Sequence, residues 1–157
     1  MSAVEFNEVG PQARTVDKVD SRFLESLMGY NARRATLAII ERFLREMAVY
    51  DLRPVDFSVM SLVVHNPGIT SSQLCSSLGL LPPNLVVMLN ALQKRKLIER
   101  LPHPNDRRAT GLYPSDAGIT LMLAAEKTAA RLESQATAKL TPAEAKTLLR
   151  LLRKIYL

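Results

Sequence analysis

Positive charge is concentrated in one short stretch of the sequence. The 157-residue chain carries 21 Lys and Arg against 15 Asp and Glu, a net charge of +6, and the segment from Pro82 to Leu112 alone carries +4. Clustered Lys and Arg neutralise phosphate groups, so this stretch indicates a polyanionic partner, most simply a nucleic acid. Against Glu99 and Asp106 stand Lys94, Arg95, Lys96, Arg100, Arg107 and Arg108.

Residues that could catalyse a reaction or hold a metal are sparse. The sequence has no glycine-rich phosphate loop, no cluster of His with carboxylates, and no Ser, His and Asp whose order suggests a nucleophile and its base. His65 and His103 are too few and too far apart for a zinc site. We therefore predict that the protein is not an enzyme and uses no cofactor and no metal.

The single cysteine, Cys75, excludes an intramolecular disulfide framework and fits a reducing compartment. We expect Cys75 to pack in the core, because no positive neighbour in its helix would favour the reactive thiolate; a redox sensor is the alternative. The first 20 residues contain no apolar run, so we expect no signal peptide. These features together predict a cytoplasmic protein.

The segment from Thr70 to Leu89 has the spacing of a helix-turn-helix. Thr70 is a suitable N-cap for a helix to Leu78, and Gly79 tolerates the positive φ of a tight turn. The Pro82-Pro83 pair then opens a second helix that reaches about Lys96. This spacing alone also fits an ordinary hairpin of two helices. The apolar positions expected to pack this pair are Leu74, Leu78, Leu80, Leu85 and Met88.

The residues after this pair of helices predict a β-wing. Leu97–Leu101 and Ala109–Tyr113 alternate as short strands around a polar tip that two prolines brace, residues 102–107. A basic tip of this kind would reach the DNA backbone and the minor groove, where narrow A·T-rich segments attract Arg. We therefore expect the basic stretch to bind duplex DNA.

The flanking segments are helical and suited to dimerisation. From Asp20 to Tyr50 apolar residues recur at steps of three or four, which predicts one helix of about 45 Å whose apolar face packs on another subunit. Pro54 opens a further helix to about His65. The pattern is helical again over residues 115–157, where Thr141 begins a capping box. We expect residues 1–19 to form a loose arm.

The fold class that follows is mainly α with a small β-wing. Apolar residues make up 47% of the chain and aromatic residues only 5%, a composition that favours helices. Residues 57–93 contain no charged side chain, but Pro and Gly interrupt them before about 20 apolar residues accumulate. We therefore expect this run to be core rather than a membrane span.

The segment Leu97–Ala109, Leu-Ile-Glu-Arg-Leu-Pro-His-Pro-Asn-Asp-Arg-Arg-Ala, resembles the wing motif of the MarR family of transcription regulators. The resemblance extends from about Asp20 through the helix-turn-helix, the wing and two C-terminal helices. It implies a single domain over residues 20–157, with dimerisation helices at 20–50 and 115–157 and a DNA-binding region at 54–114. It also implies a homodimer that binds a palindromic operator, usually represses transcription, and releases DNA when a small, often aromatic and anionic, effector binds.

The resemblance assigns roles to individual residues of this chain. Arg108 resembles the arginine that enters the minor groove, Asp106 the carboxylate that braces it, and Arg107 a phosphate contact. Helix N-termini would face phosphates as well. The remaining expected DNA-binding positions are Thr70, Ser71, Ser72, Pro82, Pro83, Asn84, Val86, Val87, Asn90 and Lys94.

Several positions depart from the family pattern. The family commonly has Lys, Ser, Thr or Arg where this chain has Pro and Val, so only Asn84 and Asn90 offer an amide, for which adenine is the favoured base. The valines could contact thymine methyl groups, and we expect specificity to depend on A·T steps and DNA shape. Lys96 replaces the usual glycine before the wing, and Pro114-Ser115 replaces the usual Leu-Thr after it.

A candidate effector site and a second function complete the expectations. Tyr30 and Arg34, one turn apart, could receive an aromatic carboxylate between the apolar walls Phe57 and Met60; the alternative is a surface arginine packed over a tyrosine. The second function is a winged-helix module that binds a protein partner through the uncharged second helix and has no specific DNA target.

Overall fold

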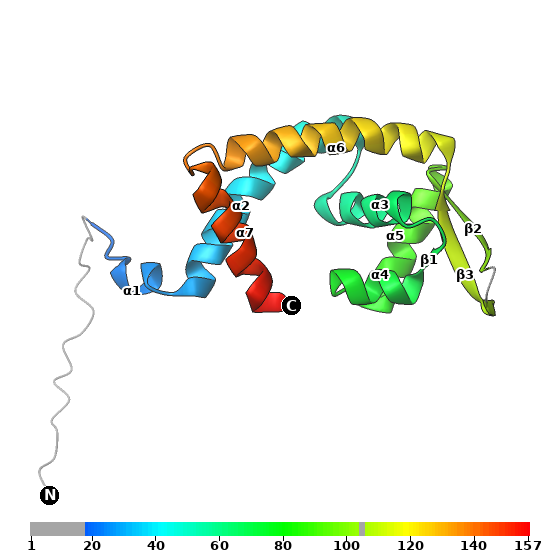
Figure 1. The fold of residues 1–157 in the computed structure, drawn as a ribbon, viewed down its shortest axis with the longest axis horizontal. Helices are drawn as coiled ribbons and strands as arrows, with labels where there is room; N and C mark the ends of the chain where they lie inside the picture. Colours follow the sequence, from blue (N-terminus) through cyan, green and yellow to red (C-terminus); the bar gives the residue numbers. More distant parts are fainter. Residues whose placement is uncertain (1–17, 104–105) are drawn as a thin grey trace, which may run out of the picture. The chain divides into compact units, whose positions relative to one another are not determined.

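The computed structural model describes residues 18–103 and 106–157, with side chains described for residues 18–102 and 110–157 (Figure 1). The chain divides into two compact units with the boundary between Ala35 and Thr36. The boundary falls inside the helix α2 (Met28–Met47). Within the described ranges no single helix is long and apolar enough to cross a membrane, although α4 (Ser71–Leu78) and α5 (Pro82–Lys94) together meet that criterion as a pair bent by 116°.

The first unit corrects the expectation of one continuous helix from Asp20 to Tyr50. A short helix, α1 (Arg22–Glu25), ends before α2 begins at Met28. At the break the Leu27 amide donates to the carbonyl of Leu24, three residues back, and Asn31 Nδ2 donates to the carbonyls of Glu25 and Leu27, each at 2.8 Å. These side-chain hydrogen bonds satisfy carbonyls that a continuous helix would have paired with its own backbone amides. The carbonyls at the break therefore have hydrogen-bond partners.

The second unit contains the remaining elements. After α2 come a 3₁₀ turn, η1 (Ala48–Tyr50), a helix bundle with a small sheet, and two C-terminal helices (Figure 1). The elements in order are α3 (Pro54–His65), β1 (Ile69–Thr70), α4 (Ser71–Leu78), α5 (Pro82–Lys94), β2 (Ile98–His103), β3 (Asp106–Pro114), α6 (Asp116–Ala136) and α7 (Pro142–Tyr156). The expected helices over 54–65, 70–78, 82–96, 115–140 and 141–157 are thus confirmed, with small shifts at their ends.

The sheet has three antiparallel strands in the order β1-β3-β2 rather than the two strands of the expected wing. The additional strand is short: Ile69 pairs with Leu112 and Thr70 with Gly111. Two glycines permit this contact, because a Cβ on Gly111 would lie 3.2 Å from the Cα of Gly68 and only 2.9 Å from the Tyr113 ring. A two-residue strand has no periodicity of its own, so the sequence pattern could not reveal it.

Local capping explains four of the helix ends. Thr70, Ser115 and Thr141 each accept a hydrogen bond at their side-chain oxygen from the amide three residues ahead. Gly79 ends α4 in the left-handed conformation at φ +63°. Lys96, at φ +59°, adopts a conformation that glycine occupies at lower cost, which accounts for the glycine that the family prefers at this point.

The core of the second unit joins α3, α5, the sheet and α6. The N-terminal end of α6 approaches the backbone before β2 so closely that a Cβ on Gly118 would lie 2.1 Å from the Leu97 carbonyl oxygen. Ser115 fixes the same approach, because its amide donates to Leu97 O and its hydroxyl to Lys96 O. The largest fully buried side chains are Met47, Met60, Leu74, Leu85, Leu89, Leu92, Ile98, Leu112, Met122, Val59 and Val63.

Candidate nucleic-acid interface

Helix α5 divides into a buried face and an exposed face. Successive residues lie about 100° apart around a helix axis, so residues at steps of three and four share a face. Leu85, Met88, Leu89 and Leu92 are buried and anchor α5 to the core. The opposite face is exposed and consists of the predicted positions Pro82, Pro83, Asn84, Val86, Val87, Asn90 and Lys94.

The N-terminus of α5 is a poor phosphate site, contrary to the expectation for helix N-termini. Pro82 and Pro83 occupy its first two positions and have no N–H group. The next amide, that of Asn84, donates to the Leu81 carbonyl at 3.1 Å. The backbone donors that a helix start normally offers an anion are therefore either missing or occupied.

The start of α4 has no proline and carries backbone N–H groups at its first two helical residues. Thr70 forms a reciprocal capping box with Gln73, in which the Thr70 amide donates to Gln73 Oε1 at 2.9 Å. Ser71 and Ser72 follow as the first two helical residues with exposed side chains, and their amides precede the first helical hydrogen bond of α4. Of the two helix starts, α4 is the one suited to a phosphate.

Asn90 is paired with a residue of the wing. Its side-chain oxygen accepts a hydrogen bond from Arg100 Nη2 on β2 at 2.8 Å, and both side chains are exposed. Sequence reasoning treated Asn90 as a free amide and counted Arg100 only as charge. Strand β2 carries Arg100 opposite Leu112 of β3, and this register places the guanidinium beside α5.

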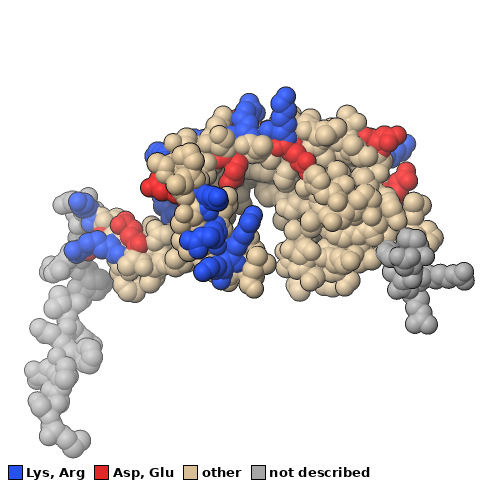
Figure 2. Space-filling view, in the orientation of Figure 1, with Lys and Arg blue, Asp and Glu red and all other residues tan. Residues whose placement is uncertain are grey.

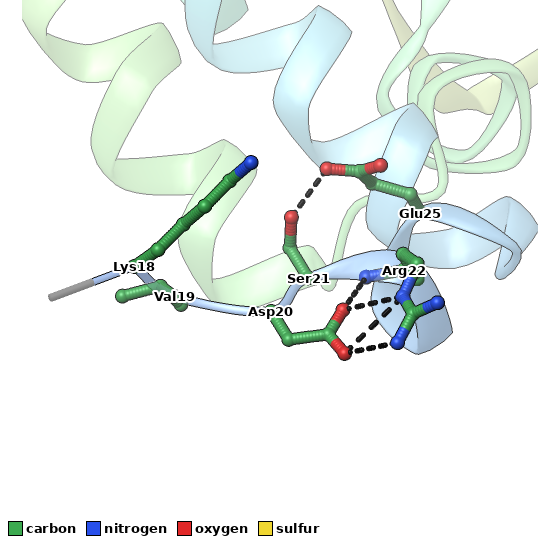
Figure 3. A pocket seen from close by; sticks show the side chains of 6 residues that line it. All are labelled: Lys18, Val19, Asp20, Ser21, Arg22 and Glu25. Carbon is green, nitrogen blue, oxygen red and sulfur yellow. Dashed lines mark hydrogen bonds and ion pairs between the residues drawn. The ribbon is translucent and has the colours of Figure 1, made fainter. Parts of the chain in front are cut away.

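The described basic residues at the end of α5 differ in their exposure. Lys94 is exposed at the end of α5, whereas Arg95 is half-buried and donates to the backbone carbonyls of Asp51 and Tyr50 at 2.6 and 2.9 Å. Arg95 is thus a structural residue. This corrects the expectation that it belongs to the positive charge that binds a polyanion. In Figure 2 the surface over α3 and α4 is largely uncharged, while Lys and Arg gather over α7.

The tip of the wing lies outside the described side chains. The backbone of β3 begins at Asp106 and pairs antiparallel with β2, with an irregularity between Pro102 and His103. The roles expected for Asp106, Arg107 and Arg108 depend on side chains outside the described residues, so these three assignments stay predictions.

The candidate effector residues are distributed over both units. Tyr30, half-buried, and Arg34, exposed, lie on α2 in the first unit. In the second, Phe57 packs edge-to-face on Phe43 with ring centroids 5.5 Å apart. Met60 is 0% exposed and belongs to the core, so it faces no open crevice in this structure and its role as an apolar wall stays a prediction. The other three residues remain a proposal.

Cys75 and His65, which the sequence also singled out, have contacts within the fold. Cys75 is half-buried and packs against the core. His65 Nε2 lies 2.9 Å from Glu126 Oε1, and Ser61 Oγ donates to the same oxygen at 2.8 Å. Because Ser61 and His65 each contact the carboxylate, the cluster joins α3 to α6 and is not arranged as a nucleophile with its base.

The fold and the exposed face of α5 define a winged helix-turn-helix protein. The MarR family model matches residues 50–109. A transcriptional repressor, CouR, solved with a 23-mer DNA duplex, matches at a TM-score of 0.83 and 36% identity over 88% of this chain and 99% of that one. The chain therefore belongs to the MarR family of transcription regulators.

A second structure of CouR and a further relative agree. CouR bound to p-coumaroyl-CoA matches at a TM-score of 0.77 and 35% identity, over 88% of this chain and 97% of that one. A putative transcriptional regulatory protein for the hcr operon of Thauera aromatica is 27% identical over 130 residues, 82% of this chain and 78% of that protein. These relatives are regulators of transcription, and this chain is a regulator rather than an enzyme.

Proposed function

We propose that two copies of this chain form a homodimeric repressor that binds a palindromic DNA operator and releases it on binding a small aromatic anion or its CoA thioester. The observation that carries the proposal is the exposed face of α5, which stands clear of the core in a chain matching a DNA-bound repressor over 99% of that protein's length. As a DNA-binding regulator the protein would act in the cytoplasm.

The terminal helices support the dimer. Helix α7 has no buried residue, and its apolar side chains, Leu148, Leu149, Leu151, Leu152 and Ile155 among them, are exposed. In the first unit, Phe23 and Met28 are 76% and 69% exposed. Apolar surface on this scale in a monomer indicates an interface, and a second copy of the same helices is its simplest partner.

The effector class follows from the relative that binds p-coumaroyl-CoA, an aromatic acid joined to a phosphate-rich carrier. Tyr30 and Arg34 suit this chemistry, since an aromatic ring and a guanidinium one turn apart can contact a ring and an anion. Binding that favours a DNA-incompetent arrangement of the dimer would release the operator.

The test combines oligomeric state with DNA binding. Light scattering on the purified protein should give twice 17.4 kDa. Fluorescence anisotropy with duplexes from the promoter region next to the coding sequence should detect binding to a palindrome whose half-sites lie about one helical turn apart, with affinity falling steeply as salt rises. Addition of p-coumaroyl-CoA and related thioesters should then lower the affinity. A stable monomer, or a dimer that ignores every duplex at low salt, contradicts the proposal.

The second candidate function is a protein-interaction module. The observation in its favour is the apolar character of the exposed α5 face, where Val86 and Val87 are 50% and 69% exposed. DNA binding that is weak and blind to sequence at physiological salt would favour this module, whereas an operator-length footprint would exclude it.

A further inference from the structure

We propose that Arg100 and Asn90 act as one specificity-determining pair, which makes this face of α5 prefer guanine to adenine. The inference rests on the proposed function, because it names the base that the DNA-binding face would select. It departs from the sequence expectation, in which a free Asn90 amide pairs with adenine.

Asn90 occupies the middle of the exposed α5 face. At about 100° per residue, Val86, Val87 and Lys94 lie within about 60° of it around the helix axis. A duplex that contacted these residues would therefore also meet Asn90. Arg100 reaches the same point from β2, so the pair joins the helix to the wing at the surface.

The chemistry of the contact determines how the amide is oriented. A guanidinium has only N–H donors and no acceptor, so the group of Asn90 that faces Arg100 must be its carbonyl oxygen. The NH₂ group of Asn90 consequently points away from Arg100. Recognition of adenine by asparagine requires both groups, since the NH₂ donates to N7 while the oxygen accepts from the N6 amino group. In the observed pair one lone pair of that oxygen is already taken by Arg100, so the N6 amino group would compete with a cationic donor for the same oxygen.

Guanine suits the pair better. In the major groove guanine presents two neighbouring acceptors, N7 and O6, whereas adenine and cytosine each present a donor and thymine a single acceptor. The other N–H groups of Arg100 have no partner among the described side chains, and with the NH₂ of Asn90 they offer only donors. The hydrogen bond to Asn90 also restricts the rotamers of Arg100, which reduces the entropy lost when the guanidinium binds a base.

The experiment selects binding sites from duplexes with a randomised core of about two helical turns, using the purified full-length protein. We expect a G·C pair at one position of each half-site, and we expect its replacement by A·T to weaken binding about tenfold or more. The variant Arg100→Ala frees the oxygen of Asn90. It should therefore switch the preference at that position to A·T, and the double variant with Asn90→Ala should lose both preferences.

Two control variants separate this pair from general effects. Lys94→Ala removes a positive charge from the same face and should lower affinity for all sequences alike. Asn84→Ala removes the other amide and should leave the G·C position unchanged. Circular dichroism should show native spectra for every variant, because all four side chains are exposed.

The outcomes distinguish the pair from the proposed function. If the wild-type protein binds DNA and Arg100→Ala selects the same sequence, the pair is overturned while DNA binding stands. The pair is also overturned if the wild-type protein selects adenine at the base position whose preference changes in Asn90→Ala. If no duplex is bound at low salt, the proposed function fails and the pair fails with it.

Discussion

Arg95, immediately after α5, donates a hydrogen bond from Nη2 to the backbone carbonyl of Tyr50, 2.9 Å away and 45 residues earlier in the chain. Nη1 donates to the carbonyl of Asp51, which has a φ of +50°. The Tyr50 hydroxyl in turn lies 2.9 Å from Thr128 Oγ1 on α6. One guanidinium thus connects the end of α5 to the junction between α2 and α3, and through Tyr50 to α6.

We predict that Arg95→Ala lowers the free energy of unfolding by about 2 kcal/mol, because it removes two hydrogen bonds from a charged donor to carbonyls at a tight turn. Urea denaturation followed by circular dichroism measures the change. The neighbouring exposed residue provides the control, since Lys94→Ala should change the same quantity by no more than about 0.5 kcal/mol. Equal stabilities for the two variants would show that Arg95 does not hold the junction.

Gly118 and Gly29 form a matched pair of helical glycines. At Gly118 a Cβ would lie 2.1 Å from a backbone oxygen, whereas at Gly29 it would have nothing within 4 Å. Gly118→Ala should therefore cost about 3 kcal/mol or more, because two backbone segments must separate. Gly29→Ala should add about 0.5 to 1 kcal/mol through helix propensity. Denaturation curves that move in the same direction for both would contradict the close approach of α6 to Leu97.

The left-handed conformation of Lys96 predicts a stabilising substitution. Lys96→Gly should raise the free energy of unfolding by about 0.5 to 1 kcal/mol, since glycine adopts φ +59° without the steric cost that a Cβ imposes. Lys94→Gly removes the same charge from the end of a helix and should be destabilising by up to about 1 kcal/mol. The difference between the denaturation midpoints of the two variants isolates the effect of the backbone conformation at residue 96. A loss of stability in both variants would refute that effect.

The capping box of α7 predicts an acid-dependent contribution to stability. Glu144 accepts hydrogen bonds from the amide and the hydroxyl of Thr141, and these bonds hold the pKa of its carboxyl below the ordinary value of 4.5. A depressed pKa contributes stability that is complete above the unfolded value and is lost as the pH falls through the folded one. The Tm of the wild-type protein should therefore fall more steeply below pH 4.5 than that of Glu144→Gln. Parallel curves for the two proteins would contradict this coupling.

Short-range features of the fold were predictable from neighbouring residues. The N-caps Thr70 and Thr141, the turn at Gly79 and the start of α5 at Pro82 each depend on backbone chemistry within a few residues, so a local pattern suffices to place them. The same patterns failed at the break between α1 and α2. There Asn31 supplies partners for two carbonyls, and an amphipathic period contains no sign of such a bond.

The sequence by itself determined that this protein is a mainly helical, basic, winged-helix regulator. Capping, turn chemistry, apolar periodicity and the wing motif each depend on residues close together in the sequence. Only the tertiary structure decided which individual side chains are buried or paired and how many strands the sheet has. It turned Arg95 inward, buried Met60, added β1 to the sheet and placed Arg100 on Asn90. Each of these features depends on contacts between residues in separate segments of the chain. The packing of helices and strands, and no local preference, brings such residues together.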